Sequence, residues 1–135
     1  MPSRTTTIRQ KIALPAPPDI IYDLLMDPAK HSEFTGSEAF GSSEVGGEFV
    51  AWDGYIIARN VDLKRGKRIV QEWSTSEWPE EMPPSHLEIT LNKMDQGTEL
   101  ILVQTKVPAE QADDYAQGWH DFYWKPMLEY LNKIK

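Results

Sequence analysis

Histidine and cysteine are the residue types that would most directly indicate a metal site or a nucleophile. The three histidines, His31, His86 and His120, are scattered, and no HxH or HxxxH spacing places two of them on one face of a strand or helix. The chain contains no cysteine, which excludes disulfides and thiolate chemistry. The sequence therefore predicts no metal site and no cofactor.

The paired carboxylates do not predict a catalytic acid and base, because adjacent side chains diverge. Glu80-Glu81 lies in a proline-rich stretch expected to be a loop, and Asp113-Asp114 lies where a helix is expected to begin, which favours negative charge. Ser42-Ser43 lacks the strand–turn–helix context of an activated nucleophile. We therefore expect no catalytic residue. An enzyme would have to use the few strand residues that titrate or carry charge, which are Tyr55, Arg59 and His86.

The net charge of −7 argues against nonspecific binding to nucleic acid, which requires a basic surface. One basic cluster, residues 64–68 (KRGKR), falls at an expected turn, where it is either a solvated tip or a surface for a protein partner. No apolar run approaches the roughly 20 residues that span a bilayer, and no signal-peptide core follows Met1. We expect no membrane span and a cytoplasmic location.

The C-terminal stretch 109–134 is the element most able to position a site. Its apolar residues recur at steps of three and four, the pattern of one amphipathic helix. Gly118 costs about 1 kcal/mol relative to alanine in a helix, and Pro126 removes a backbone hydrogen bond and should bend the helix. Either this bend leaves space beside the helix, or Gly118 admits a close neighbour and Pro126 follows a fraying end.

The rest of the chain predicts a small helix pair and about six strands. A helix from Pro18 to Asp27 and a further turn at 28–34 follow the first strand. Strands joined by tight turns form an antiparallel sheet, whose buried face only the long helix is available to cover. We therefore predict one α+β domain over residues 1–135. The strands are expected at 5–13, at 48–63 with a turn at Asp53-Gly54, at 67–73, at 86–92 and at 98–107, with a loop or weak edge strand at 35–47.

A pocket between this sheet and the helix would be mostly apolar with a few polar anchors. Strand alternation places Gln104 on the same face as Leu100 and Leu102, and Gln71 on the same face as Trp73. Each glutamine either points into the pocket or lies at an exposed strand end. We favour plain core packing for Trp73 and leave open whether Trp119 packs in the core or lines the cavity. Trp124 does not belong to the apolar stripe of the helix and is a candidate surface contact. The predicted ligand-binding residues are Gln71, Trp73, Leu100, Leu102, Gln104, Tyr115, Trp119, Phe122 and Tyr123.

Several segments, in this order along the chain, resemble a known family. They are GGEFVAWDGY at 46–55, KRIVQEW at 67–73, Trp78-Pro79, LEITL at 87–91, GTELIL at 97–102, Val107-Pro108 and Gly118-Trp119. With the predicted element order, they resemble the helix-grip fold of the START-like (SRPBCC) superfamily. The more specific resemblance is to the activators of the heat-shock protein 90 ATPase, in particular their C-terminal domain and its free-standing relatives.

The resemblance implies a fold but leaves the function open, because a shared fold hosts unrelated activities. In the superfamily, the space between sheet and helix holds lipids, polyketides, plant hormones or other hydrophobic molecules. Our leading hypothesis is a non-enzymatic binder of a small hydrophobic ligand. The first alternative is a stress-response protein with a chaperone partner, acting through the 64–68 turn, the 76–84 loop and Trp124. The second is a cyclase- or hydrolase-like enzyme that uses the same cavity.

Overall fold

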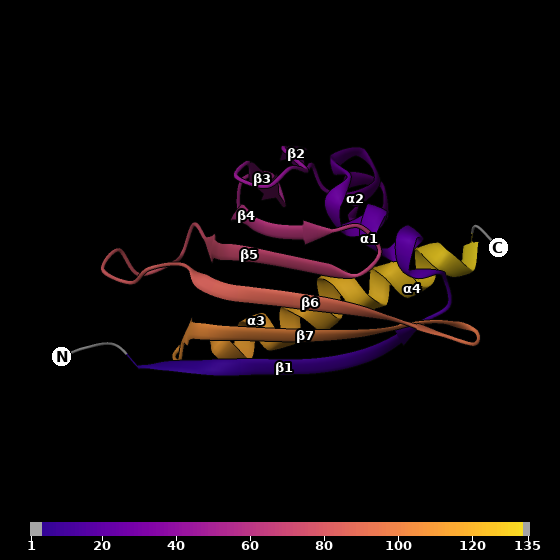
Figure 1. Cartoon of the computed structure of the whole chain (residues 1–135). Coiled ribbons are helices and arrows are strands. Elements are labelled where there is room, and N and C mark those ends of the chain that lie inside the picture. Colours follow the sequence, from indigo (N-terminus) through magenta and orange to yellow (C-terminus); the bar gives the residue numbers. More distant parts are fainter. Residues whose placement is uncertain (1–3, 134–135) are drawn as a thin grey trace.

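One seven-stranded antiparallel sheet forms the body of the molecule in a computed structural model that describes residues 4–133 (Figure 1). Its spatial order is β1-β7-β6-β5-β4-β3-β2, so the first strand lies beside the last one. The predicted α+β fold, with short helices after the first strand and a long C-terminal helix, is confirmed. The strands are β1 (Thr5–Leu14), β2 (Phe40–Gly41), β3 (Glu48–Ala51), β4 (Ile56–Lys64), β5 (Arg68–Thr75), β6 (Ser85–Met94) and β7 (Gly97–Pro108).

The prediction of six strands was wrong, because β2 is a seventh strand at the sheet edge. It has only two residues, and it pairs Phe40 with Val50 and Gly41 with Phe49. Gly41 has a φ of 113°, and a Cβ built there would lie 2.3 Å from the carbonyl oxygen of Glu48, so the pairing requires glycine. A strand this short shows no alternation, which explains why the sequence pattern did not separate it from a loop.

The helix pair after β1 forms for reasons that are visible in the sequence. Helix α1 (Pro18–Met26) begins with a proline, whose missing N–H costs nothing at that position. Asp27 ends α1 and caps α2 (Pro28–Thr35), because its carboxylate accepts hydrogen bonds from the backbone N–H groups of Ala29 and Lys30. The predicted break at Asp27-Pro28 is therefore confirmed.

The C-terminal helix runs along one face of the sheet (Figure 1). It contains one π-helical turn. Helix α3 (Ala112–Trp119) continues into a π-helical turn, η1 (His120–Trp124), and then into α4 (Lys125–Lys133). In η1 the backbone N–H of Lys125 donates to the carbonyl of His120, five residues back. Pro126 has no N–H to donate to the backbone carbonyl of Phe122. The wider π turn keeps the proline ring away from that carbonyl. A π turn that the sequence did not predict thus precedes Pro126, and α4 continues past the proline.

The π turn moves the buried stripe by one residue and corrects the placement of Trp124. Trp124 is 3% exposed, stacks on Trp119 with ring centroids 5.6 Å apart, and donates its indole N–H to Gln10 at 2.7 Å. Phe122, which belongs to the regular stripe, is instead 55% exposed. Because a π turn holds an extra residue, Tyr123 and Trp124 both face inward. The prediction that Trp124 is a surface contact was wrong.

The core lies between the sheet and the C-terminal helix. Leu100, Leu102 and Met127 have no exposed surface, and Gln71 and Gln104 also point inward rather than lying at exposed strand ends. The alternation of Leu87, Ile89 and Leu91 on one buried face is as predicted. Within residues 4–133, no helix has the length and apolar character that a bilayer crossing requires.

Candidate ligand-binding site

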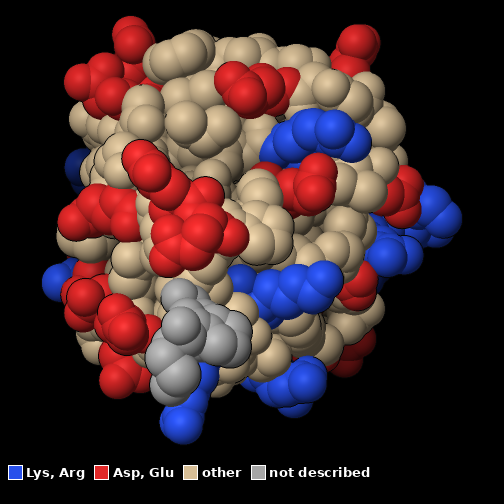
Figure 2. Space-filling view, turned by 90° about the vertical axis from the view of Figure 1, so that its left-hand side faces the viewer, with Lys and Arg blue, Asp and Glu red and all other residues tan. Residues whose placement is uncertain are grey.

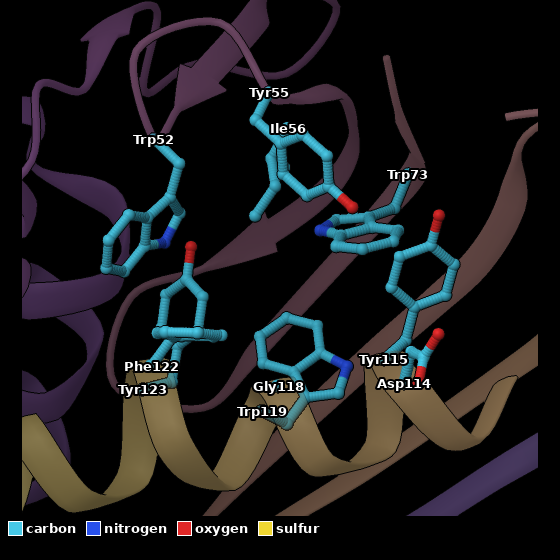
Figure 3. Close-up of a pocket in the computed structure, with 10 residues that line it drawn as sticks. All are labelled: Trp52, Tyr55, Ile56, Trp73, Asp114, Tyr115, Gly118, Trp119, Phe122 and Tyr123. Atoms are coloured by element: carbon cyan, nitrogen blue, oxygen red, sulfur yellow. The ribbon is translucent and has the colours of Figure 1, made fainter. Parts of the chain in front are cut away.

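A cavity of about 430 Å³ lies between α3–η1 and the β3–β4 end of the sheet (Figure 3). This volume falls in the range of small-molecule sites, which is about 300–1,000 Å³. Seven of its ten lining residues are aromatic, and the side chains come from both the helix and the sheet side. The lining consists of Trp52, Tyr55, Ile56, Trp73, Asp114, Tyr115, Gly118, Trp119, Phe122 and Tyr123.

Five of the nine predicted ligand residues line this cavity. They are Trp73, Tyr115, Trp119, Phe122 and Tyr123. Leu100 and Leu102 are fully buried in the core and do not border it. Gln71 borders a separate void of about 30 Å³, which has room for about one water molecule. Gln71 donates there to the side-chain oxygen of Asn60 at 2.9 Å.

Gln104 acts on the cavity through Trp119 rather than lining it. Its side-chain oxygen accepts the indole N–H of Trp119 at 2.9 Å, and its amide nitrogen donates to the Ser85 hydroxyl at 3.0 Å. Ser85 in turn donates to the carbonyl of Trp73 at 2.7 Å. This buried chain of hydrogen bonds fixes the orientation of Trp119, one of the cavity walls. Gln104 is therefore a positioning residue.

Trp52 is a lining residue that the sequence analysis missed. It lies in the turn between β3 and β4, which occupies residues 52–55 rather than only Asp53-Gly54. Trp52 and Asp53 have φ angles of 53° and 57°, a left-handed conformation that costs a bulky residue roughly 1–3 kcal/mol. The Trp52 ring packs edge-on against Phe122, with centroids 5.4 Å apart. Turn residues follow no alternation, so only the presence of an aromatic residue beside Asp-Gly signalled this role.

The indole N–H of Trp73 faces the cavity without a hydrogen-bond acceptor in the part of the chain described. The other buried tryptophans, Trp119 and Trp124, donate to Gln104 and Gln10 at 2.9 and 2.7 Å. Trp73 is only 4% exposed, and its nitrogen points toward the centre of the cavity (Figure 3). Every fully buried side-chain nitrogen or oxygen among the described residues has a hydrogen-bond partner, so the Trp73 N–H must reach the open space of the cavity. An acceptor group of a ligand could pair with it there in place of water.

The tyrosine hydroxyls at the cavity are hydrogen-bonding groups rather than bases. Tyr55 donates to a carboxylate oxygen of Glu77 at 2.6 Å, and the Tyr115 hydroxyl bonds to the Thr75 hydroxyl at 2.7 Å. Burial raises the pKa of Tyr55, Tyr115 and Tyr123 above the ordinary value. All three hydroxyls therefore remain protonated at neutral pH.

His31, on α2, was not predicted as a site residue. It does not line the cavity, but it bonds to Tyr123, which does. Its Nδ1 lies 3.0 Å from the carbonyl oxygen of Leu25, which can only accept, so Nδ1 carries the hydrogen. Its Nε2 therefore accepts the hydroxyl hydrogen of Tyr123, at 3.0 Å. Burial lowers the pKa of His31 to about 4. The neutral imidazole thus fixes Tyr123 on the inner wall.

The other residues considered for chemistry lie away from the cavity or in ion pairs. Arg59 pairs with Glu72 at 3.4 Å, and His86 is exposed on β6. In the basic 64–68 turn, Arg65 pairs with Asp23 at 2.7 Å and Arg68 with Glu88 at 3.1 Å, so part of its charge is neutralised within the chain. Among residues 4–133, no three His, Asp or Glu side chains come together in a group that could hold a metal ion.

Comparisons with known proteins match most of this chain. It is 29% identical over 116 residues to an activator of 90 kDa heat shock protein ATPase homolog from Dictyostelium discoideum, covering 85% of the chain and 30% of that protein. The homolog 1 protein from Homo sapiens is 30% identical over 111 residues, covering 80% of the chain and 32% of that protein. The chain thus spans about a third of the length of these curated relatives.

Solved structures show the same fold over most of the chain. An HSP90 activator from Plasmodium falciparum superposes with a TM-score of 0.83 at 20% identity, covering 95% of this chain and 96% of that chain. Protein CV1439 from Chromobacterium violaceum has a TM-score of 0.70 at 25% identity and covers 92% and 95%. A family model described as Activator of Hsp90 ATPase homolog 1-like protein matches residues 15–132. This chain therefore belongs to the family of Activator of Hsp90 ATPase homolog 1-like proteins, as the sequence resemblance indicated.

Proposed function

We propose that this protein is a non-enzymatic binder of a small hydrophobic molecule, held in the aromatic cavity between the C-terminal helix and the sheet. The proposal rests on the cavity of about 430 Å³, into which the N–H of Trp73 points without an acceptor among the described residues. The aromatic walls supply apolar contact area, and Trp73 supplies one directional contact. The expected ligand is therefore a flat aromatic molecule that carries a hydrogen-bond acceptor.

Gly118 supports this proposal, because it leaves space rather than admitting a close neighbour. A Cβ built on Gly118 would meet only the Phe122 ring, at an ordinary contact distance of 3.6 Å. Glycine is therefore not required there for close packing, although it costs the helix about 1 kcal/mol relative to alanine. Any larger side chain at this position would enter the cavity that Gly118 lines.

The Gly118→Leu substitution should abolish binding without lowering stability. The leucine side chain would occupy the cavity, while its helix propensity exceeds that of glycine by nearly 1 kcal/mol. A suitable probe is 6-propionyl-2-(dimethylamino)naphthalene, a neutral fluorophore with a ketone acceptor, titrated while its emission shift is recorded. The matched control is Gly118→Ala, which should gain similar stability but retain binding. Equal binding by the leucine and alanine variants would contradict a ligand site beside Gly118.

A chaperone partner is a second candidate function, favoured by the family match over residues 15–132 and by relatives named as activators of the 90 kDa heat shock protein ATPase. This role would use the outer surface rather than the cavity. We expect the purified chaperone to associate equally well with the unmodified chain and with Gly118→Leu. The Lys64→Glu/Lys67→Glu double variant should weaken association, measured by calorimetry. No saturable association at micromolar concentrations would rule this candidate out.

A further inference from the structure

The charges beside the cavity select among the ligands that the proposed function allows. Among the ten lining residues, all from the described range 4–133, Asp114 is the one charged side chain and none is Lys or Arg. Glu77 stands at the same end, because its carboxylate accepts the Tyr55 hydroxyl and its backbone carbonyl accepts the Gln111 amide at 3.0 Å. Figure 3 shows Asp114 next to Tyr115, at that end of the cavity.

The negative charges at this end of the cavity affect the pKa of the Tyr115 hydroxyl. Burial is the main reason that its pKa is raised, and the charges of Glu77 and Asp114 raise it further. On the surface of this end of the molecule, Asp and Glu side chains gather on one side of the view (Figure 2). The β5–β6 loop, with Glu80 and Glu81, reaches this same end (Figure 1). An anionic ligand would enter against this field, and none of the ten described lining residues is a Lys or Arg that could pair with it.

We propose that the ligand of the aromatic cavity is an organic cation, whose positive group lies at the Asp114–Glu77 end and whose acceptor group meets the Trp73 N–H. This inference rests on the proposed binding function and adds the charge of the ligand. Aromatic faces attract cations by about 0.5–1 kcal/mol each where water reaches, and by about 2 kcal/mol where it is excluded. The seven aromatic rings of the lining, with a carboxylate at one end, match an ammonium group on an aromatic skeleton.

Asp114 supplies negative charge at one end of the cavity, and Trp73 supplies a hydrogen-bond donor. A carboxylate in the first turn of α3 has another role, since it also interacts favourably with the helix N-terminus. The acidic end alone would therefore not define a site. The second observation is the indole N–H of Trp73, which has no acceptor within residues 4–133; its side chain is 4% exposed and points into the same cavity.

The test uses three naphthalenes that share the 6-propionyl acceptor and differ at position 2. One carries a trimethylammonium group, one the neutral dimethylamino group, and one a carboxylate. In calorimetric titrations at low salt, the cation should bind about tenfold tighter than the neutral probe, and the anion most weakly. The preference should shrink at high salt, because Asp114 is exposed and its charge is screened. The Gly118→Leu variant should also fail to bind the cationic probe. That result would place the binding of this probe inside the cavity.

Two matched variants separate Asp114 from general acidity. Asp114→Asn should weaken binding of the cationic probe about threefold to fivefold more than binding of the neutral probe. Asp113 lies in the same helical turn but does not line the cavity. Asp113→Asn removes the same charge and should leave the affinities for the cationic and the neutral probe unchanged. Tightest binding of the neutral or anionic probe would overturn the cation proposal and leave the binding function standing. Failure of all three probes to bind would overturn both.

Discussion

Replacing Trp124 with alanine should lower the free energy of unfolding by about 3–5 kcal/mol, the usual cost of truncating a large buried aromatic residue. Trp124 is 3% exposed, and the variant would lose its stacking on Trp119 and its hydrogen bond to Gln10. Urea unfolding followed by far-UV circular dichroism measures the change. A loss of this size is expected only if the π turn places Trp124 in the core.

Phe122→Ala is the matched control for the register of the helix. Phe122 is 55% exposed at the cavity mouth, so its truncation should cost about 1 kcal/mol or less. A regular α-helix through residues 109–134 would reverse the two effects, because Phe122 and not Trp124 belongs to the regular stripe. A larger loss for Phe122→Ala than for Trp124→Ala would therefore exclude the π turn in solution.

Lowering the pH from 7.5 to 5 should destabilise the protein by about 2 kcal/mol through His31 alone. The pKa of His31 in the folded protein is about 4, below the ordinary value of 6.5 that applies when the chain is unfolded. Between these two values the unfolded state binds more protons than the folded state. The stabilisation from neutral His31 is therefore complete above pH 6.5 and is lost as the pH falls toward 4.

Urea unfolding at several pH values between 7.5 and 5 checks this prediction, because most carboxylates remain ionised in that range. His31→Gln should start from a lower stability, since it disturbs the bonds to Leu25 and Tyr123, but it should lose the pH dependence assigned to His31. The matched control is His86→Gln, on the exposed face of β6, which should keep the wild-type slope. Identical slopes for wild type and His31→Gln would show that another group is responsible.

Much of the fold was predictable from the sequence because local rules determine it. Pro18 and Asp27-Pro28 bound the first helix, and the alternation of Leu87, Ile89 and Leu91 identifies β6 and its buried face. The features that were missed depend on contacts between distant segments. The π turn, for example, follows from the need to accommodate Pro126 while Trp124 packs against Gln10 of β1. A periodicity that assumes one helix type cannot contain this information.

The cavity was predictable only where regular elements line it. Tyr115, Trp119 and Tyr123 share one helical face, so their convergence follows from spacing. Leu100 and Leu102 lie on the correct face of β7, but alternation says which side a residue faces and not how far the helix stands from it. Trp52 and His31 escaped prediction, because a left-handed turn position and a buried imidazole are set by tertiary packing.

The pairing of β1 with β7 makes cavity formation depend on contacts between distant parts of the sequence. Thr5 lies opposite Pro108, and Leu14 lies opposite Thr98, so β1 has its neighbour in the sheet only once the β7 segment has been made. The segment that closes the cavity, α3 and η1, follows still later. Contacts between residues so far apart in sequence slow folding, since a large chain loop must close before they contribute. A ligand of this cavity could therefore stabilise the folded domain but could not guide folding before β7 and α3 have joined β1.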